Sequence, residues 1–397
     1  MTSTIGHDVV LDGNFDPSTA RVVMIGAGQV ARMTYQASVD YGIAFHVLAT
    51  AADDPAVIAG AAHTLGRYDC YSDLAAAANH GQVVTFDHDQ VTAANLHTLE
   101  EADHLLRPNA RALAFAQDRL YIREKLARLG HLAVPMARFA PASTMADLIA
   151  FTAEHGWPVV LKARRSGCKG PRSHFLAGPG DASRLLPDTP NAPESAWVVE
   201  EYLELAGELA ILVARRPSGQ LASYPPVGIH QIDGVLREFI MPAQLPDDIV
   251  SDAVCLAESV VAGLDATGVC AVKFFWTTDG RLLLNGLTLR PYSSGYATIE
   301  ACATSQFHQH LRGVLDWPLG PTTLISPVAT VNLIGKGQGV DLSTRLPEAL
   351  GISGARVHLY TRTSRPGRNF GHVTALGIST EEALAAARAA ATLLTQP

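Results

Sequence analysis

Arg21-Val-Val-Met-Ile-Gly-Ala-Gly-Gln-Val-Ala31 decides the beginning of the fold, because an apolar run leads directly into closely spaced glycines. A short apolar run bounded by glycine is typical of a buried strand, and the residues after it have a helical pattern. Two further predicted strands, Phe45 to Leu48 and Gln82 to Phe86, alternate with alanine-rich helical segments. Such alternation is typical of a parallel sheet covered by helices. We therefore predict that residues 1–110 form a doubly wound α/β domain.

The glycine turn itself has the spacing Gly26-x-Gly28-x-x-Ala31, which occurs in dinucleotide-binding turns. A dinucleotide site also needs an acidic residue about 20 positions later, whereas the second predicted strand ends Leu48-Ala-Thr50. The missing acid argues against NAD. Two interpretations remain: a tight strand-to-helix turn without a ligand, or a site for a sugar phosphate, whose oxygens backbone N–H groups can bind.

A smaller second domain is predicted over residues 111–193. Residues 112–129 have a helical pattern, and a further helix over 144–155 precedes a strand over 159–162. Residues 178–193 are rich in Pro, Asp and Ser, which favours a loop or a domain boundary.

The remaining residues, 194–397, are predicted to form an α+β domain. Its predicted strands cover residues 197–202, 208–214, 221–225, 271–276, 282–285 and 357–361. Asp279-Gly280 predicts a hairpin between two of them. Ser379-Thr-Glu-Glu382 is a capping pattern, which predicts the start of an alanine-rich helix over 380–394.

Composition narrows the class of protein. The 397 residues carry a formal net charge of −8, so the chain lacks the basic surplus expected of a protein that binds a nucleic-acid polymer. No run of about 18 apolar residues predicts a membrane span, and residues 1–20 lack a signal-peptide pattern, so we expect a cytoplasmic protein. The five cysteines form no CxxC pair and are expected to be reduced thiols.

Several separated segments together resemble the 5-(carboxyamino)imidazole ribonucleotide synthetase family. The segments are 26–29, 85–90, 116–119, 160–162, 199–201, 224–226, 233–237, 304–307, 332–335, 365–368 and 371–372. Members of this family are ATP-grasp ligases of purine biosynthesis that use ATP and bicarbonate to carboxylate aminoimidazole ribonucleotide. The resemblance implies an ATP-grasp fold with the N-terminal domain, a small lid domain over 111–193 and the C-terminal domain. It also implies a homodimer.

The resemblance implies a set of nucleotide contacts. In the family a lysine of the small domain contacts the ATP phosphates, and acidic residues of central strands bind adenine and ribose. The matching residues are Arg119, Lys162, Glu200 or Glu201, and Glu208. A lysine suits phosphate as a compact charge with three donors, and a carboxylate can accept from ribose hydroxyls. The alternative for the two adjacent glutamates is a solvated strand end.

The resemblance also implies contacts to the phosphate of a ribonucleotide. The matching basic residues are Arg290, Arg362 and Arg368, and the glycine turn contributes Gly28 and Gln29. Arginine can bind phosphate through two parallel hydrogen bonds. The alternative is a solvated basic loop.

The chain departs from the family where catalytic magnesium would bind. The family has acidic residues at the positions of Lys273 and Gly286, and magnesium prefers such oxygen ligands. We therefore predict no ordinary magnesium site, and we expect Lys273 to neutralise a phosphate or carboxylate instead. The family's two histidines near this site are Tyr292 and Tyr296 here. Lys273, Arg290, Tyr292 and Tyr296 are thus the candidate catalytic residues.

Three further sequence features are weaker signals of function. The family's glycine-rich flap corresponds to Ser166-Gly-Cys-Lys-Gly-Pro-Arg172, in which Pro171 removes a backbone donor. Cys168 lacks a sequence signal for a base that would make it a nucleophile. His308 and His310 stand two residues apart, which places them on different faces of a helix and argues against a shared metal.

Three hypotheses follow. The first is a divergent enzyme that binds an aminoimidazole-ribonucleotide-like small molecule and performs altered chemistry in specialised nucleotide or nucleoside metabolism. The second is the family's own ATP- and bicarbonate-dependent carboxylation. The third is a nucleotide-binding protein without catalysis. The missing carboxylates argue against the second hypothesis, and the retained Lys162, Glu208, Arg290 and Arg368 argue against loss of ligand binding.

Overall fold

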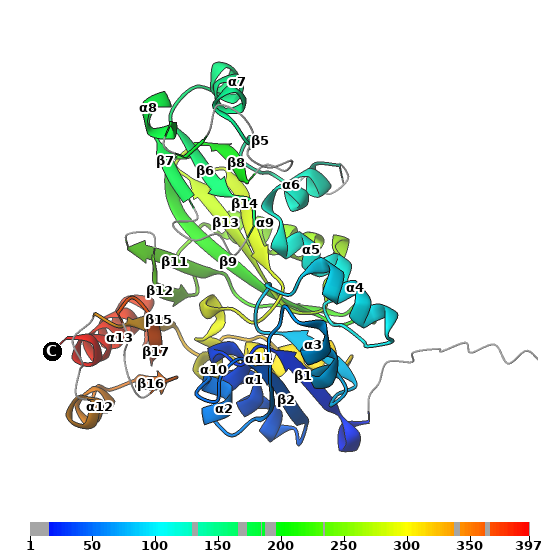
Figure 1. Cartoon of the computed structure of the whole chain (residues 1–397). Helices are drawn as coiled ribbons and strands as arrows, with labels where there is room; N and C mark the ends of the chain where they lie inside the picture. Colours follow the sequence, from blue (N-terminus) through cyan, green and yellow to red (C-terminus); the bar gives the residue numbers. More distant parts are fainter. Residues whose placement is uncertain are drawn as a thin grey trace, which may run out of the picture.

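The computed structural model describes residues 16–128, 134–165, 173–183, 185–186, 196–232, 235–336, 342–361 and 366–396. These residues form three sheets (Figure 1). The N-terminal domain lies at the bottom of the view and a lid domain at the top, with long strands running between them. The C-terminal strands and helices lie beside the N-terminal domain. The predicted arrangement of a parallel N-terminal domain, a small lid domain and a C-terminal α+β domain is confirmed.

The N-terminal sheet is parallel and has the order β3-β2-β1-β4. Its elements are β1 (Arg21–Ile25), α1 (Gln29–Asp40), β2 (Ala44–Ala49), α2 (Pro55–Ile58), β3 (Ala62–Leu65), α3 (Tyr71–Ala78), β4 (Val83–Phe86) and α4 (Ala93–Glu101). Side chains of β1 alternate between two cores. Val22 and Met24 pack on the α1 side, and Val23 and Ile25 pack on the side of α3 and α4. Both faces are therefore covered, as predicted. Sequence patterns do not predict β3, because its side chains are mostly exposed.

The helix predicted over 112–129 is two helices, α5 (Ala110–Gln117) and α6 (Arg119–Arg128). Asp118 between them has an extended backbone, so the first helix ends there. Its carboxylate then accepts hydrogen bonds from the N–H groups of Leu120 and Tyr121, both at 3.0 Å, which caps the second helix.

The lid domain is an antiparallel sheet of order β5-β8-β6-β7. Its elements are β5 (Phe139–Ala142), α7 (Met145–His155), β6 (Val159–Ala163), β7 (Ser173–Leu176), α8 (Pro179–Ala182) and β8 (Trp197–Glu201). Thr144 and Asp147 form a capping box at the start of α7. Leu148 and Phe151 of this helix pack against Leu161 and Val199 of the sheet. The lid thus has its own small core.

The described residues of the C-terminal part form one nine-stranded sheet, in which β10 pairs with β9 and the rest follow the order β14-β13-β9-β11-β12-β15-β17-β16. Its strands are β9 (Leu205–Arg215), β10 (Leu221–Ser223), β11 (Val227–Ile232), β12 (Val235–Met241), β13 (Gly268–Thr277), β14 (Leu282–Thr288), β15 (Val328–Ile334), β16 (Ala355–Leu359) and β17 (Asn369–Leu376). The predicted hairpin at Asp279-Gly280 joins β13 and β14, and Gly280 has a φ of +84°. Sequence patterns do not predict β11, β12, β15 and β17, in which polar residues or glycine interrupt the apolar runs.

Helices cover this sheet on both faces. They are α9 (Asp247–Gly263), α10 (Thr298–Ala301), α11 (Gln306–Val314), α12 (Leu342–Leu350) and α13 (Thr380–Thr395). Leu209 and Ile211 of β9 belong to the core beneath α9, whereas Ala210 and Leu212 belong to the core on the opposite face. Because both faces are buried, β9 and β13 are nearly continuous apolar runs. The capping pattern at Ser379 is also present, because its side chain accepts from the N–H of Glu382.

His310 joins the N-terminal domain to the large sheet. Its Nε2 lies 2.8 Å from Thr85 Oγ1 on β4, and its Nδ1 accepts from the N–H of Val269 on β13 at 3.1 Å. Complete burial lowers the pKa of His310 to about 3, so the ring is neutral at physiological pH. Arg107 adds a second link by donating to the carbonyl oxygen of Val314 at 2.6 Å. The domains around the candidate site are therefore fixed to one another by buried hydrogen bonds. Among the described helices, none combines the length and apolarity needed to cross a membrane.

Candidate nucleotide and substrate site

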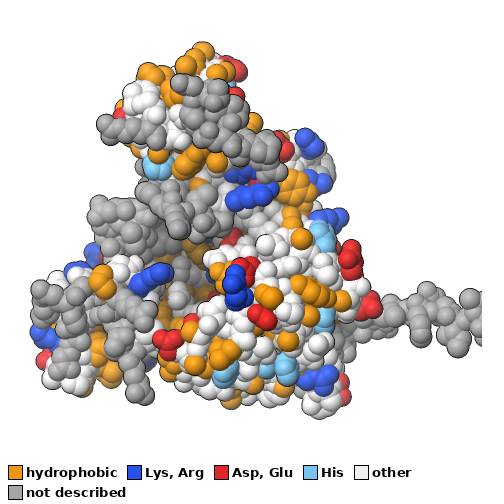
Figure 2. Space-filling model, in the orientation of Figure 1, with side chains coloured by type: hydrophobic (Ala, Val, Ile, Leu, Met, Phe, Trp, Pro, Cys, Tyr) orange, Lys and Arg blue, Asp and Glu red, His pale blue; other side chains and the backbone are white. Residues whose placement is uncertain are grey.

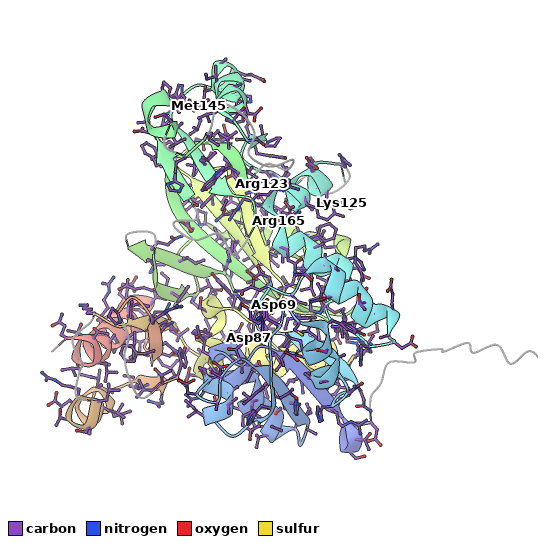
Figure 3. The ribbon with its side chains drawn as sticks, in the orientation of Figure 1. Asp69, Asp87, Arg123, Lys125, Met145 and Arg165 are labelled. Atoms are coloured by element: carbon purple, nitrogen blue, oxygen red, sulfur yellow. The ribbon has the colours of Figure 1, made fainter. Side chains whose placement is uncertain are left out.

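A cavity of about 560 Å³ lies where the lid domain, helices α5 and α6, and strands β9, β13 and β14 meet. The segment after β4 also reaches it, through His88, Asp89 and Gln90. Figure 3 shows Arg123 and Arg165 beneath the lid sheet, with Asp87 at the facing edge of the N-terminal domain. Basic side chains gather on the same face between the lid and the N-terminal domain in Figure 2. A concave site at a junction of domains is a common place for a small-molecule ligand.

A buried ion cluster forms the wall under the lid. Glu200 of β8 forms ion pairs with Arg123 of α6 and with Lys162 of β6, and the charged atoms are 2.6 Å apart in each pair. The Glu200 side chain is only 3% exposed, so it is not the solvated strand end considered as its alternative. Burial alone would raise the pKa of Glu200, but the two adjacent cations outweigh burial and hold the pKa below its ordinary value. The carboxylate is therefore ionised and compensated.

Lys162 is held in place by several neighbours. Besides Glu200, its Nζ lies 3.3 Å from Asn285 Oδ1 and 4.9 Å from the centroid of the Phe275 ring. Burial lowers the pKa of Lys162, an effect that the charge of Glu200 opposes. Arg123 donates to the carbonyl oxygen of Asn285 at 3.0 Å and so helps to hold Asn285 beside Lys162. The ammonium is thus positioned at the cavity wall by groups from three separate segments.

Arginines form a second wall around Asp118. Arg164 lies 2.9 Å and Arg165 3.3 Å from Asp118 Oδ2. Arg119, a predicted nucleotide-binding residue, lines the cavity and donates through Nε to the carbonyl oxygen of Ala163 at 3.2 Å. Burial tends to raise the pKa of Asp118, but its hydrogen bonds to Arg164 and to the N–H of Tyr121 lower it overall. This wall presents positive charge to the cavity.

The other two predicted acidic contacts also line the cavity. Glu208 of β9 accepts from Gln231 Nε2 at 2.7 Å, and burial raises its pKa. Glu201 lines the opposite side, where its Oε1 accepts from the N–H of Arg138 at 3.0 Å. Both carboxylates keep oxygen atoms that can accept from the hydroxyls of a ribose.

Lys273, Arg290 and Tyr292 meet in the same cavity, where both cations lie near the Tyr292 ring. The Lys273 ammonium lies 3.9 Å from the centroid of the Tyr292 ring, and the Arg290 guanidinium carbon lies 5.8 Å from it. Lys273 of β13 is paired in register with Gly286 of β14. Such cation–π contacts stabilise a charged side chain without neutralising it. Three of the four candidate catalytic residues are thus brought together.

The residues around Lys273 and Gly286 do not fit a divalent metal. Among the described residues, no group of three or more His, Cys, Asp and Glu side chains is arranged to hold one. Magnesium needs hard oxygen ligands, and a cation at position 273 opposes its binding. A side chain at position 286 would have open space around its Cβ, so glycine is not required there by packing.

The remaining predicted residues lie elsewhere. Tyr296 is 1% exposed in the core between α1 and α11 and does not line the cavity. It is therefore separated from Lys273 and Tyr292, with which we expected it to form an altered centre. Its hydroxyl bonds with Gln29, and burial raises its pKa to about 12. Tyr296 also stacks on His372, with 4.7 Å between ring centroids.

The glycine turn is satisfied within the protein. The N–H of Gly28 donates to Asp87 Oδ2 at 2.6 Å, so a carboxylate takes the place where a bound phosphate was expected. Arg368 is exposed and outside the cavity lining, although its carbonyl oxygen accepts from the N–H of Gly335 at 3.0 Å. Arg362, together with Cys168 and the segment 166–172, lies outside the described residues.

The two histidines of α11 have different partners. His308 bonds to Asp40 Oδ2 at 2.9 Å, whereas His310 bonds to Thr85 and Val269. Their ring nitrogens are therefore engaged on different sides of the helix.

Sequence reasoning missed several residues of the cavity wall. Arg123, Phe275 and Asn285 contact the Glu200 and Lys162 pair, and His88 lines the cavity after β4. His88 follows the carboxyl end of a parallel strand, which is a recognised location for ligand-binding residues. The helical pattern around Arg123 contains no comparable signal, because its partner is a glutamate 77 positions away in the sequence.

Three family models match the chain in sequence order. They are the ribonucleotide synthetase preATP-grasp domain over residues 19–117, the ATP-grasp domain over 127–307 and the phosphoribosylaminoimidazole carboxylase C-terminal domain over 329–386.

The chain is similar to curated proteins along most of its length. It is 40% identical over 367 residues to N5-carboxyaminoimidazole ribonucleotide synthase of Mycobacterium tuberculosis, covering 90% of this chain and 83% of that protein. It is 35% identical over 385 residues to the Synechococcus elongatus protein of the same name, covering 94% of each.

Solved structures also superpose on this chain along most of its length. N5-carboxyaminoimidazole synthase from Aspergillus clavatus, in complex with ADP and 5-aminoimidazole ribonucleotide, superposes with a TM-score of 0.85 at 27% identity. The alignment covers 96% of this chain and 99% of that one. The Thermus thermophilus N5-carboxyaminoimidazole ribonucleotide synthetase gives 0.83 at 30% identity, covering 95% and 99%.

Proposed function

Because the chain belongs to the N5-carboxyaminoimidazole ribonucleotide synthase family, we propose that it uses ATP and bicarbonate to carboxylate the amine of aminoimidazole ribonucleotide. The observation that carries this proposal is the cavity between lid and large sheet, in which Lys162, Glu201, Glu208 and Arg290 all lie. The similarity extends through all three parts of the chain, so it includes every element that lines the cavity. The second of the three hypotheses is therefore preferred.

Each cavity residue has a defined task in this reaction. Lys162 offers a compact positive charge to the nucleotide phosphates, and Glu201 and Glu208 accept from the ribose hydroxyls. The buried Nε of Arg290 has no hydrogen-bond partner among the described residues, which suits a donor to the phosphate of a ribonucleotide. The arginine wall around Asp118 adds positive charge beside the nucleotide.

The proposed chemistry has two stages. A bicarbonate oxygen attacks the terminal phosphorus of ATP, and ADP leaves, which forms carboxyphosphate. The amine of the substrate then forms a bond to the carboxyl carbon as the C–O bond to phosphate breaks, which releases inorganic phosphate and the amine proton. The protein's part is to hold the reacting groups together in a closed site, where positive side chains stabilise negative charge.

One observation favours a second candidate, a divergent reaction on a similar ribonucleotide. Lys273 stands opposite Gly286, and Tyr292 covers the ammonium, so the end of the cavity differs chemically from a carboxylate-lined metal site. This candidate keeps nucleotide and ribonucleotide binding but changes the group that is transferred.

The test measures ADP release and carbon incorporation together. Purified full-length protein is supplied with ATP, aminoimidazole ribonucleotide and ¹³C-bicarbonate, and each component is omitted in turn. Formation of labelled N5-carboxyaminoimidazole ribonucleotide with one ADP per product supports carboxylation. ADP release that needs the ribonucleotide but transfers no ¹³C supports the second candidate. Absence of ADP release with retained ligand binding contradicts both and favours a non-catalytic binding protein.

We also propose a cytoplasmic homodimer. The expectation rests on the family resemblance, and light scattering of the full-length protein tests the assembly directly. A mass of one chain at micromolar concentration contradicts it.

A further inference from the structure

The cavity has a surplus of positive charge. Among the described residues that line it are seven arginine and lysine side chains and four carboxylates. One of those carboxylates, Glu200, is already shared by Arg123 and Lys162, and burial favours the neutral form of another, Glu208. A site of this kind suits an anion that arrives without a cation of its own.

Lys273 is the cation best placed to act on such a ligand. It makes no hydrogen bond or ion pair with the described residues, whereas Lys162 is held by Glu200 and Asn285. Its backbone is fixed on β13, which has strand partners on both sides, β9 and β14. The Tyr292 ring at 3.9 Å restrains the ammonium, which keeps its charge and makes no hydrogen bond to a described acceptor.

The space beside Lys273 is open. Its register partner is Gly286, and a Cβ at that position would meet no atom of the described residues within 4 Å apart from its immediate chain neighbours. Both residues line the cavity, together with Arg290, whose buried Nε lacks a hydrogen-bond partner among the residues that the structure describes. Two unsatisfied cationic donors therefore border unfilled space that no carboxylate side chain of β14 occupies.

From this geometry we infer that the Lys273 ammonium takes the place of a divalent cation beside the phosphates of a nucleotide, so that binding of the nucleotide does not require magnesium. The inference rests on the proposed function only in assigning a nucleoside triphosphate to this cavity. A fixed lysine supplies one positive charge and direct hydrogen bonds to phosphate oxygens. Arg290 adds a second positive charge near the same Tyr292 ring. A Mg²⁺ ion added beside Lys273 would meet two cations, and neither position 273 nor position 286 would supply a carboxylate.

The experiment is calorimetric titration of the full-length protein with the non-hydrolysable ATP analogue adenylyl-imidodiphosphate, once with excess EDTA and once with excess magnesium. The inference expects Kd values within about threefold of each other, because the protein itself supplies the counter-charge. Lys273→Met should weaken binding in EDTA by about tenfold or more, the loss of one charge-assisted contact. Lys273→Arg keeps the charge and should retain most of the binding.

Lys125→Met is the matched control. Lys125 is on α6 outside the cavity lining, so this variant changes net charge equally and should leave both Kd values unchanged. The double variant Lys273→Glu with Gly286→Glu creates a carboxylate pair and should bind the analogue about tenfold more tightly with magnesium than without it. Thermal unfolding of each variant shows whether it is folded.

The outcomes separate the inference from the proposed function. Wild-type binding at least tenfold tighter in magnesium overturns the inference but leaves the proposed function standing, as does unchanged EDTA binding in folded Lys273→Met. Metal-independent binding without carboxylation leaves the inference standing and overturns the proposed function. Failure to bind the nucleotide under either condition overturns both.

Discussion

Two charged clusters that line one cavity differ in how their buried cations are compensated. Under the lid, Glu200 compensates Arg123 and Lys162 within the protein. In the second cluster, Lys273 and Arg290 lie against the ring of Tyr292, and neither forms an ion pair with a described carboxylate. The first cluster holds the fold together at the junction of α6 and the lid, and the second leaves its charge available to a ligand. The charge of Lys162 is therefore compensated by the protein before a nucleotide binds, whereas Lys273 is paired with no described carboxylate.

The largest expected effect comes from removing the compensating carboxylate. Glu200→Gln leaves Arg123 and Lys162 close together, both buried and unpaired, and should lower the free energy of unfolding by about 3–5 kcal/mol. Urea unfolding of the full-length protein measures this change. The matched control is Glu201→Gln on the same strand, whose amide oxygen can still accept from the N–H of Arg138 and which should cost about 1 kcal/mol or less. Equal effects of the two variants would show that the cluster under the lid does not stabilise the fold.

Next in size is the contrast between the two lysines. Lys162→Met leaves Glu200 with Arg123 alone and should cost about 1–3 kcal/mol in unfolding free energy. Lys273→Met removes a cation–π contact at a half-buried position and should cost about 1 kcal/mol or less. Urea unfolding without ligand measures both. A larger loss for Lys273→Met would mean that this lysine stabilises the fold and would break the distinction between the clusters.

The same contrast shows how far the sequence predicts this molecule. The apolar runs of β1, β2 and β4 predict the parallel domain, because a strand buried on both faces has few polar residues. The family resemblance predicts that Lys162 and Lys273 both lie at the ligand site. It does not show which of the two lysines is paired with a carboxylate of the protein.

Which lysine is compensated depends partly on Arg123, the second partner of Glu200. The sequence pattern predicts that Arg123 is helical, but it does not show that its side chain reaches Glu200. Tyr296 shows the opposite limit. It stands four residues after Tyr292 in the sequence, yet packing against Phe307 and His372 places it in the core, outside the cavity lining. Long-range partners of this kind arise from the tertiary fold and leave no local pattern.

Acid should distinguish the clusters by a smaller effect. The pKa of Glu200 lies below its ordinary value in the folded protein, because Arg123 and Lys162 outweigh burial. Its contribution to stability is therefore present above the unfolded pKa, near 4.5, and is lost as pH falls through the lower folded pKa. One carboxyl group changes the free energy of unfolding by at most about 1.4 kcal/mol per pH unit.

Urea unfolding at a series of pH values below 5 measures this dependence. Glu200→Gln should lack this component of the acid slope. Lys273→Met should keep it, because Lys273 has no ion pair with a described carboxylate. An unchanged slope in Glu200→Gln would mean that other groups account for the acid dependence.

The smallest expected effect concerns exposure rather than charge. Arg164 and Arg165 both pair with Asp118, but their side chains are 17% and 59% exposed. Arg165→Met should change the free energy of unfolding by less than about 1 kcal/mol, because solvent screens an exposed pair and Arg164 still satisfies Asp118. Arg164→Met should cost more, since this guanidinium donates to both oxygens of the carboxylate at 2.9 Å. If the two variants are equally stable, exposure does not decide the strength of a pair at this wall. The difference between cations that are paired with a carboxylate and cations that are not would then have to be explained by the geometry of each contact, without solvent exposure.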